Sequence, residues 1–500
     1  MAPERPGSRQ LPTGVAGFDA VLEGGLPERR MYLVQGDPGA GKTTLSLQFL
    51  LAGVASGERA LYISLSETRE ELDSIALAHG WSFEGLSILE VSSDAARDEV
   101  DTTLYQPSEV ELGDRMREIL EHIDRLRPTR IVLDSCSELR LLAQSGLRYR
   151  RQILAMKRRL AELNCTILLI DNPQPGMSDT LLQSLVHGVL AMEQLAPQYG
   201  AERRRLRVMK LRGLRYRGGY HDFVIRTGGV VVFPRLVAAE HRLEVPRDRV
   251  SSGLAELDAL LGGGPQRGTS LLLMGPSGSG KSSIAARYAL AAAERGERAA
   301  IYAFDESVAM LHGRAASLGL PLDPHVERGT LSVQQIDPAE LSPGEFAHLA
   351  RRAVEVDGVR VVVLDSLNGF ISAMPEERFV LLQLHELLTY LGQRGVLTLL
   401  TVAQHGLVAG EGTAPVDVSY LADTVLLFRY FEARGEVRKA LSAVKNRSGP
   451  HEKTIRELLI DDGTGIHVGP VLSEFRGVLT GVPDWARADG GTAAIGEESG

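Results

Sequence analysis

Short apolar runs recur along the chain and are separated by longer segments with helical periodicity. In the first half the apolar runs lie at 31–34, 60–65, 130–134 and 165–170, and helical patterns between them include 112–126 and 149–163. In the second half the matching apolar runs lie at 270–274, 299–304, 360–365 and 396–402. Near-continuous apolar strands separated by helices predict a mainly parallel sheet that is covered on both faces.

Each half then ends in a different pattern, with short strand-like runs and glycine-rich turns. These runs lie at 206–211, 223–225 and 230–233 and, in the second half, at 440–444, 454–459 and 465–468. We therefore predict an α/β protein with two tandem domains, each a mainly parallel sheet between helices with a small antiparallel C-terminal part.

The length of 500 residues is compatible with two or three domains, and composition suggests where they divide. We expect a disordered leader at 1–10, a first domain at 11–236, a linker at 237–250 and a second domain at 251–483. The remaining residues, 484–500, are rich in glycine, alanine and acid, so we expect a disordered tail.

A constant offset of 239 positions relates the two halves. It carries Gly14 to Gly253, Asp19 to Asp258, Arg59 to Arg298, Lys42 to Lys281 and Glu67 to Glu306. An offset that holds over more than fifty residues indicates a duplicated domain, and its period is far too long for a solenoid.

The duplication includes a phosphate-binding motif, which runs from Gly36 to Thr43 and again from Gly275 to Ser282. Both copies satisfy G-x-x-x-x-G-K-[ST], and each follows an apolar run and opens a helix-like run. Such a loop turns backbone N–H groups toward phosphate oxygens, and the helix adds its positive end. The residues expected to bind ATP are Gly36, Gly39, Gly41, Lys42, Thr43, Thr44, Gly275, Gly278, Gly280, Lys281, Ser282 and Ser283.

Within each copy, Lys42 or Lys281 would reach the β- and γ-phosphates, and the hydroxyl of Thr43 or Ser282 would ligate Mg²⁺. ATP and Mg²⁺ are therefore the expected cofactors.

Composition narrows the class of protein further. The chain is 44% hydrophobic and 24% charged, which is ordinary for a globular protein, and no apolar run approaches the length of a membrane span. The first seven residues lack an apolar signal-peptide core, and the two cysteines lack metal-ligand spacing, so we expect a cytoplasmic protein. A net charge of −9 gives no general attraction to nucleic acid, although a local patch could supply one.

Two aspartates end apolar strands with the same Leu-Asp-Ser sequence, Asp134 in the first half and Asp365 in the second. A strand-terminal aspartate opposite a P-loop is the expected Mg²⁺-positioning carboxylate. The alternative is a structural role at a helix N-cap or turn. The P-loops favour the metal role.

Hydrolysis also needs a group that orients or deprotonates water. The candidates are Glu67 in the first half and Asp305 or Glu306 in the second, each after the strand next to the P-loop strand. Alternatively, Glu67 and Glu306 simply begin a helix, where an acid suits the helix dipole. Gln174 and Gln404 follow the third strand of each half and are either γ-phosphate sensors or surface residues.

A basic run from Arg203 to Arg217 has three readings: a solvated strand face, a nucleic-acid contact, or cations supplied to ATP on a neighbouring subunit. Its Lys210-Leu-Arg212 segment recurs as Lys445-Asn-Arg447, whereas the cluster at 203–205 does not recur. The recurring cations are therefore assigned to nucleotide chemistry, and the other arginines to a solvated face.

The residues together resemble the KaiC-like two-domain proteins of the RecA-type P-loop ATPase superfamily over roughly residues 11–483. The most specific part is the block from Leu421 to Glu436, continued by Lys445-Asn446-Arg447, His451 and Ile455-Arg456-Glu457. The segment Lys210–Gly213 is likewise similar to the first domain of that family.

The resemblance implies RecA-like domains in a hexameric double ring, with ATP held between adjacent subunits. One subunit would supply the P-loop lysine, and its neighbour would supply Lys210 and Arg212, or Lys445 and Arg447. It also implies slow hydrolysis that drives conformational change, and phosphate transfer in the second ring to a Ser-Thr pair, which here is Ser419 and Tyr420. The serine of this pair is kept and the threonine is replaced, so the resemblance implies autophosphorylation at Ser419 and not a two-site cycle.

Two further departures separate the chain from a full clock component. The first domain has Ser66-Glu67 where the family usually has adjacent glutamates, and the tail lacks the helical, charged segment that clock members use to bind a partner protein. The favoured function is an ATP-hydrolysing oligomeric switch with an unidentified signalling partner. The alternatives are a RecA-type DNA-stimulated ATPase and a nucleotide-dependent assembly scaffold.

Overall fold

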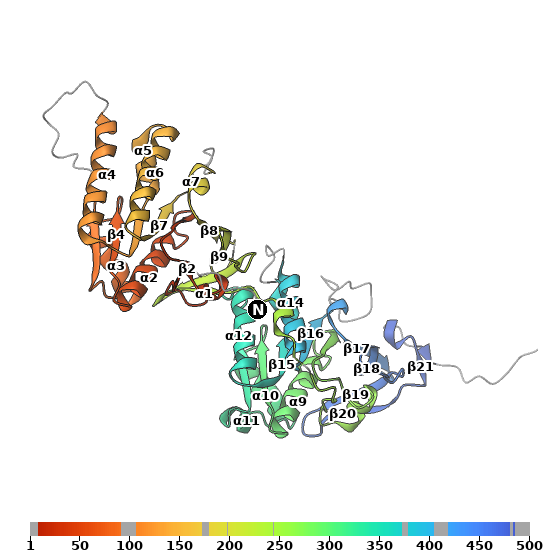
Figure 1. Cartoon of the computed structure of the whole chain (residues 1–500). Helices are drawn as coiled ribbons and strands as arrows, with labels where there is room; N and C mark the ends of the chain where they lie inside the picture. The colour runs from red at the N-terminus through yellow and green to blue at the C-terminus, as the bar shows by residue number, and fades with distance from the viewer. Residues whose placement is uncertain are drawn as a thin grey trace, which may run out of the picture. The chain divides into compact units, whose positions relative to one another are not determined.

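The computed structural model describes residues 9–91, 107–172, 180–197, 199–243, 245–372, 379–404, 419–480 and 484–485. The chain divides into two compact units, residues 1–235 and 236–500. Each unit is built around one nine-stranded sheet, which confirms the predicted tandem α/β architecture (Figure 1).

The sheet of the first unit has the order β11-β10-β9-β8-β3-β7-β6-β4-β5. The strands from β8 to β5 are parallel, and β9, β10 and β11 add an antiparallel extension. Their bounds are β3 Met31–Gly36, β4 Ala60–Ser64, β5 Leu86–Glu90, β6 Arg130–Asp134, β7 Thr166–Asp171, β8 Gly188–Leu195, β9 Arg203–Leu211, β10 His221–Arg226 and β11 Gly229–Phe233. A separate pair joins β1 Gln10–Leu11 to β2 Leu26–Pro27.

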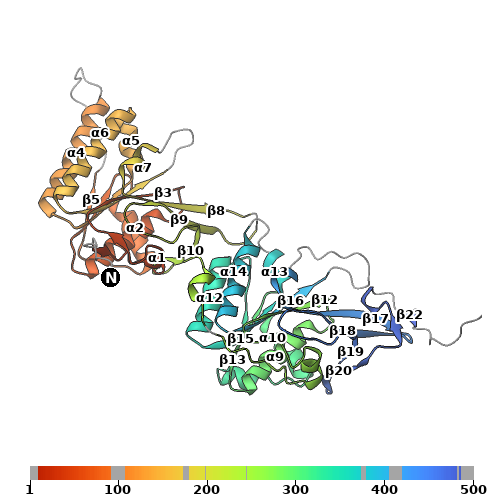
Figure 2. The same cartoon turned by 45° about the vertical axis from the view of Figure 1, so that its right-hand side comes forward.

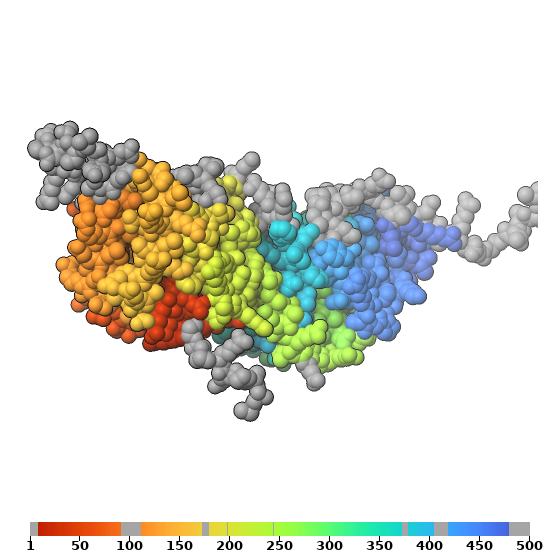
Figure 3. All heavy atoms as spheres, turned by 45° about the horizontal axis from the view of Figure 1, so that its top comes forward, coloured from red at the N-terminus to blue at the C-terminus, as the bar shows by residue number. Residues whose placement is uncertain are grey.

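Helices cover both faces of this sheet, as the predicted apolar strands require (Figure 2). Tyr32 and Val34 pack with α1, α2 and α3, whereas Met31 and Leu33 pack with α4, α5, α6 and α7. The bounds are α1 Phe18–Val21, α2 Lys42–Ala55, α3 Arg69–His79, α4 Pro107–Leu126, α5 Cys136–Ala143, α6 Gly146–Glu162 and α7 Thr180–Leu185. On the face shown in Figure 3, orange and yellow residues that include α4 and α6 lie at the surface of this unit.

The second unit repeats the arrangement, with the order β14-β13-β15-β16-β12-β17-β18-β19-β20. Its strands are β12 Ser270–Gly275, β13 Arg298–Ala303, β14 Leu331–Gln335, β15 Val359–Asp365, β16 Leu397–Ala403, β17 Thr424–Ala433, β18 Glu436–Asn446, β19 Arg456–Asp461 and β20 Gly465–Val471. Its helices are α8 Ala255–Leu260, α9 Lys281–Glu294, α10 Val308–Ser317, α11 Asp323–Glu327, α12 Pro343–Glu355, α13 Leu367–Ser372 and α14 Val380–Gln393, with short η1 Ala238–His241, η2 Ser419–Leu421 and η3 Val478–Thr480.

Several expectations need correction. The strand that follows the first P-loop strand in sequence, β4, is not next to it in the sheet. Strands β7 and β6 lie between β3 and β4. The expected leader at 1–10 and tail at 484–500 each contain a paired strand end, since Gln10 pairs with Pro27 in β1 and β2, and β22 Asp484–Trp485 pairs with β21 Phe475–Arg476. The expected linker belongs to the second unit, where η1 packs on α14 and Ala238 is buried.

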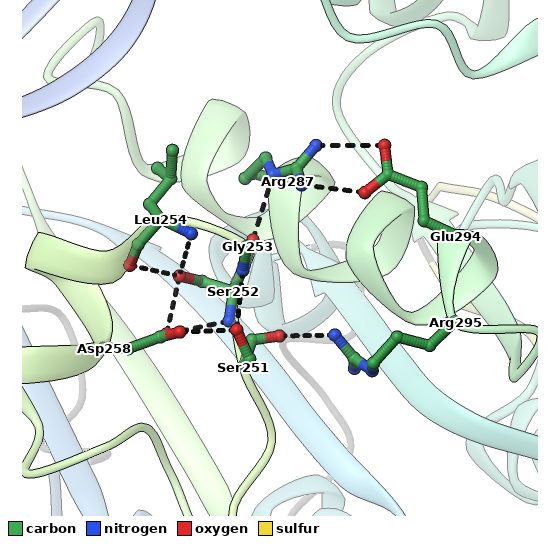
Figure 4. A network of polar contacts seen from close by, with 8 residues as sticks. All are labelled: Ser251, Ser252, Gly253, Leu254, Asp258, Arg287, Glu294 and Arg295. Carbon is green, nitrogen blue, oxygen red and sulfur yellow. Dashed lines mark hydrogen bonds and ion pairs between the residues drawn. The ribbon is translucent and has the colours of Figure 1, made fainter.

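The duplication is also visible in the loop before each P-loop strand. In the first unit the backbone N–H and hydroxyl of Thr13 donate to Oδ1 of Asp19, at 3.0 and 2.7 Å. In the second unit Ser252 makes the same two bonds to Asp258, at 2.8 and 2.7 Å (Figure 4). Arg287 of α9 donates to the carbonyl of Ser252, so this loop is tied to the helix that follows the P-loop. The recurring aspartates are therefore structural.

Candidate functional site

The first P-loop connects β3 to α2, and its glycines are needed for their backbone conformation and for space. Gly39 and Gly41 have φ of 82° and 88°, in the left-handed region that favours glycine. A Cβ on Gly36 would lie 2.2 Å from the carbonyl oxygen of Met192, and one on Gly41 would lie 2.6 Å from Cδ1 of Ile225. The antiparallel extension therefore packs directly against the phosphate loop.

The second P-loop has the same construction between β12 and α9. Gly278 and Gly280 have φ of 75° and 105°. A Cβ on Gly275 would lie 2.5 Å from the carbonyl oxygen of Phe428, and one on Gly280 would lie 2.2 Å from Cδ1 of Ile460. The predicted glycines thus occupy matching positions in the two units.

Both P-loop lysines are buried, each with only 7% of its surface exposed. Each ammonium donates to two carbonyls of its own P-loop, at 2.8 and 2.8 Å for Lys42 and at 2.9 and 2.6 Å for Lys281. Burial lowers the pKa of Lys42, against the raising effect of Asp134, Asp37 and Asp171. Burial likewise lowers the pKa of Lys281, to about 8. A polyphosphate would supply the negative charge that these buried cations need.

Each unit also pairs a P-loop hydroxyl with the strand-end aspartate. The hydroxyl of Thr43 lies 2.8 Å from Oδ2 of Asp134, and that of Ser282 lies 3.0 Å from Oδ1 of Asp365. This is the donor set with which P-loop proteins hold Mg²⁺, the other ligands being phosphate oxygens and water. The described residues contain no group of three or more carboxylate, histidine or cysteine side chains that could hold a metal ion.

The two metal-site aspartates are supported differently. Tyr62 of β4 donates to Asp134 at 2.7 Å, whereas Thr401 of β16 donates to Asp365. The position that matches Tyr62 in the second unit is an isoleucine, and so is the position that matches Thr401 in the first unit. Burial raises the pKa of Asp134, against the lowering effect of the hydrogen bonds from Tyr62 and Thr43 and of the charge of Lys42.

The first candidate general base, Glu67, lies between β4 and α3 and faces Asp134. Ser64 holds its backbone, because the Ser64 hydroxyl accepts from the Glu67 N–H at 2.9 Å. Oε2 of Glu67 is buried and accepts no hydrogen bond from any described residue. Burial, followed by the charges of Asp134 and Glu71, raises the pKa of Glu67 to about 7. A carboxylate with this pKa is suited to take a proton from water near neutral pH.

The matching carboxylate in the second unit, Glu306, has a cation beside it. Arg314 of α10 donates to both oxygens of Glu306, at 2.7 and 3.3 Å, and also donates to the hydroxyl of Ser283 at 3.1 Å. The neighbouring Asp305 accepts a hydrogen bond from the hydroxyl of Ser366, which follows the metal-site aspartate. All the predicted acids therefore lie at their P-loops, but in unlike surroundings.

The second site is a pocket of about 440 Å³ at the carboxyl ends of the parallel strands. This volume is within the usual range for a small-molecule site. Its lining residues include Ser277, Gly278, Lys281, Ser282, Ser283, Asp305, Glu306, Arg314, Asp365, Lys439, Ile460 and Asp462.

Lys439 was not predicted, although it lies in β18, the same strand as Lys445. It pairs with Tyr430, whose hydroxyl donates to the carbonyl of Ser277 in the second P-loop at 3.1 Å. The same register in the first unit pairs Gln194 with Arg204. The arginine cluster at 203–205 therefore does recur at one position, contrary to our expectation from sequence.

The assignment of Arg205 and Arg207 to a solvated face was also wrong. Arg205 forms an ion pair with Glu193 at 2.8 Å and stacks on the ring of Tyr220 at 4.2 Å, and Arg207 stacks on the same ring at 5.0 Å. The antiparallel pairing of β8, β9 and β10 brings these side chains together. This pairing could not be predicted from the sequence alone.

The two recurring cation pairs occupy equivalent positions far from their own P-loops. Lys210 pairs with Val189, which is level with Leu33 of β3, three residues before Gly36. Lys445 pairs with Val425, which is level with Leu272 of β12, three residues before Gly275. Arg212 and Arg447 follow two residues later, still farther from the P-loop end of the sheet.

Ser419 also lies at this far end. The ammonium of Lys445 donates to the Ser419 carbonyl at 2.8 Å, and Leu421, at the end of the same short helix, accepts from the hydroxyl of Ser270, where β12 begins. Gln404, in contrast, lies by the P-loop, since its N–H donates to the carbonyl of Gly275. Gln174 lies outside the described residues.

Two P-loops, each with a buried lysine and a hydroxyl–carboxylate pair at the carboxyl end of a parallel sheet, define a tandem RecA-like nucleotide-binding protein. A family model described as "ATPase: KaiC" matches residues 11–237 and 250–473. The chain belongs to this KaiC ATPase family, which makes it a KaiC-like ATP-binding protein.

Curated relatives agree with this assignment over nearly the full length. The circadian clock oscillator protein KaiC of Thermostichus vulcanus is 26% identical over 487 residues, which cover 95% of this chain and 92% of that protein. The circadian clock protein KaiC3 of Synechocystis is 26% identical over 498 residues, which cover 96% and 95%. In the described part of this chain, no helix is long and apolar enough to cross a membrane.

Proposed function

We propose that this protein is a Mg²⁺-dependent, slowly ATP-hydrolysing switch that assembles as a homohexamer. The observation that carries the proposal is the pairing of Thr43 with Asp134, and of Ser282 with Asp365, beside a buried P-loop lysine in both units. This arrangement supports a site in which metal and lysine neutralise the β- and γ-phosphates.

In the hydrolytic step a carboxylate takes a proton from water while the water oxygen bonds to the γ-phosphorus. The bond from that phosphorus to the β,γ-bridging oxygen breaks, and ADP leaves with the electron pair. Glu67 is the proposed base of the first site, and Asp305 and Glu306 are the candidates in the second. Lys42 and Lys281 stabilise the charge that develops on the phosphate oxygens.

The sheet register supports ATP sites shared between subunits. Lys210 and Arg212, like Lys445 and Arg447, lie at the end of the sheet away from the P-loop of their own unit. They are therefore suited to reach the nucleotide of a neighbouring subunit rather than their own, like arginine fingers supplied in trans.

The same placement supports serine autokinase activity across a subunit boundary. Ser419 lies beside Lys445, so a γ-phosphate that Lys445 contacts in a neighbour's site would be near the Ser419 hydroxyl. The serine oxygen would then replace water as the nucleophile and lose its proton to a carboxylate of that site.

A DNA-stimulated ATPase is the less favoured alternative, because Arg205 and Arg207, which could have contacted phosphates, are occupied by Tyr220. An assembly scaffold differs from the favoured function in needing no turnover. We propose a cytoplasmic location and a protein signalling partner of unidentified sequence.

Release of labelled phosphate from [γ-³²P]ATP with Mg²⁺, with and without single-stranded DNA, tests the activity, and native mass with ATP, ADP and no nucleotide tests the assembly. We expect slow release that DNA does not change, and a hexamer that forms with ATP. The absence of phosphate release from the wild-type chain would refute the proposed activity. If the Ser419→Ala protein still becomes labelled with ³²P to the same extent, Ser419 is excluded as the phosphate acceptor.

A further inference from the structure

The two ATP sites differ at one position on the helix that follows each candidate base. This position lies outside the P-loop motifs, so comparing those motifs does not reveal it. Glu67 and Glu306 each precede a helix N-cap, Thr68 in the first unit and Ser307 in the second. Eight residues beyond each glutamate, on the helix that follows, the first unit has Ile75 and the second has Arg314.

Arg314 donates a hydrogen bond to each oxygen of the second carboxylate. The guanidinium donates to Oε2 of Glu306 at 2.7 Å and to Oε1 at 3.3 Å, a two-pronged arrangement that fixes the carboxylate plane. A third bond, to Ser283 in the first turn of α9, anchors the arginine to the helix of the P-loop. Both partners of the ion pair line the nucleotide pocket, so the pair is part of the site and not a surface contact.

Ile75 cannot make these bonds, and it packs instead against the apolar core beneath α3. The Glu67 carboxylate is consequently left with one buried oxygen that no described residue contacts by a hydrogen bond. An oxygen of this kind is free to accept the proton of an attacking water, whereas the oxygens of Glu306 are both engaged.

We propose, building on the ATPase function above, that Arg314 is a positioning residue that holds Glu306 away from its role as a base and makes the second site the slower hydrolase. The surroundings of the two glutamates thus differ by one side chain, Arg314, whose position is taken by Ile75 in the first unit. A slower second site would keep its ATP intact for longer.

The test uses the full chain with one site silenced at a time. Lys42→Ala reports turnover at the second site, and Lys281→Ala reports turnover at the first. In the Lys42→Ala background we expect Arg314→Ile to raise kcat by about tenfold with little change in KM, because freeing a positioned base has effects of this order or larger. Arg314→Lys keeps the charge but not the two-pronged contact, so we expect an intermediate kcat.

The reciprocal change is Ile75→Arg in the Lys281→Ala background, where we expect kcat to fall by about tenfold. Arg328→Ile is the matched control, since Arg328 is exposed at the end of α11 and, among the described residues, its side chain donates to the carbonyl of Pro324 and to no carboxylate. If Arg314→Ile does not fold, as judged by circular dichroism, Arg314→Gln replaces it.

An unchanged or lower kcat in Arg314→Ile, or a rise in KM without a rise in kcat, would overturn the inference, because Arg314 would then be a ligand of the nucleotide or a purely structural residue. Failure of the proposed ATPase function would give a distinguishable result, because the wild-type chain and both silenced backgrounds would then release no phosphate.

Discussion

Replacing Glu67 by glutamine should both abolish hydrolysis at the first site and stabilise the first unit at alkaline pH. The carboxylate is partly buried beside Asp134 and Glu71, and its pKa is raised from 4.5 to about 7. An acid whose pKa is higher in the folded chain binds its proton more tightly there than in the unfolded chain. The folded unit therefore loses stability as the pH rises from about 4.5 to 7, and the cost is complete above pH 7.

The size of this cost follows from the shift. At 1.36 kcal/mol per unit, the full shift corresponds to about 3 kcal/mol. Because Glu67 is only partly buried, solvent screening reduces this value, and we expect a gain of about 1–2 kcal/mol for Glu67→Gln at pH 8.5. The gain should be much smaller at pH 5, where the native glutamate is mostly protonated in the folded unit.

Urea denaturation without nucleotide or metal measures this gain. The chain has two tryptophans, and Trp81 lies in the first unit, so Trp485→Phe leaves fluorescence that reports on that unit. With an m-value of about 2 kcal/mol per molar urea, the midpoint should rise by roughly 0.5–1 M at pH 8.5. Kinetics in the Lys281→Ala background should show a loss of about 100-fold or more in kcat. Equal midpoint changes at pH 5 and pH 8.5 would refute the argument from burial, and retained turnover would refute the role as base.

Three further predictions concern binding, stability and assembly. Lys42→Ala and Lys281→Ala should each remove one of the two ATP sites, which calorimetric stoichiometry would detect; unchanged stoichiometry would contradict the site assignment. Arg130→Met should destabilise the first unit by about 3–5 kcal/mol in urea, because the fully buried Arg130 pairs with Glu58 at 2.7 Å, and adding Glu58→Met should recover much of this. In a Lys281→Ala background, mixing Lys210→Ala with Lys42→Ala subunits should restore hydrolysis that neither has alone; a mixture no faster than its parts would exclude the contribution in trans.

The parallel sheets and P-loops could be predicted from sequence because their signals are local. An apolar run followed by glycines and a lysine defines β3, the loop and the start of α2 within a few residues. The strand-end aspartates Asp134 and Asp365 were found for the same reason, and the structure places each within hydrogen-bond distance of its P-loop hydroxyl.

The residues that surround these motifs could not be predicted, since they arrive from strands and helix turns far along the chain. Thr401 reaches Asp365 only because β16 lies between β12 and β15. Lys439 lies in the pocket because β18 extends the sheet past the P-loop. Arg205 and Arg207 of β9 looked solvated because their stacking partner, Tyr220, comes from the segment that leads into another strand.

The different support of the two metal-site aspartates limits how the halves can exchange parts. Transplanting β4 into the second half in place of β13 would set the Tyr62 hydroxyl and the Thr401 hydroxyl against one carboxylate. The reverse transplant would place two isoleucines around Asp134 and leave only Thr43 to bond it. The strands of each half are therefore a co-adapted set, and a single strand cannot be exchanged between the halves without changing the support of the metal-site aspartate.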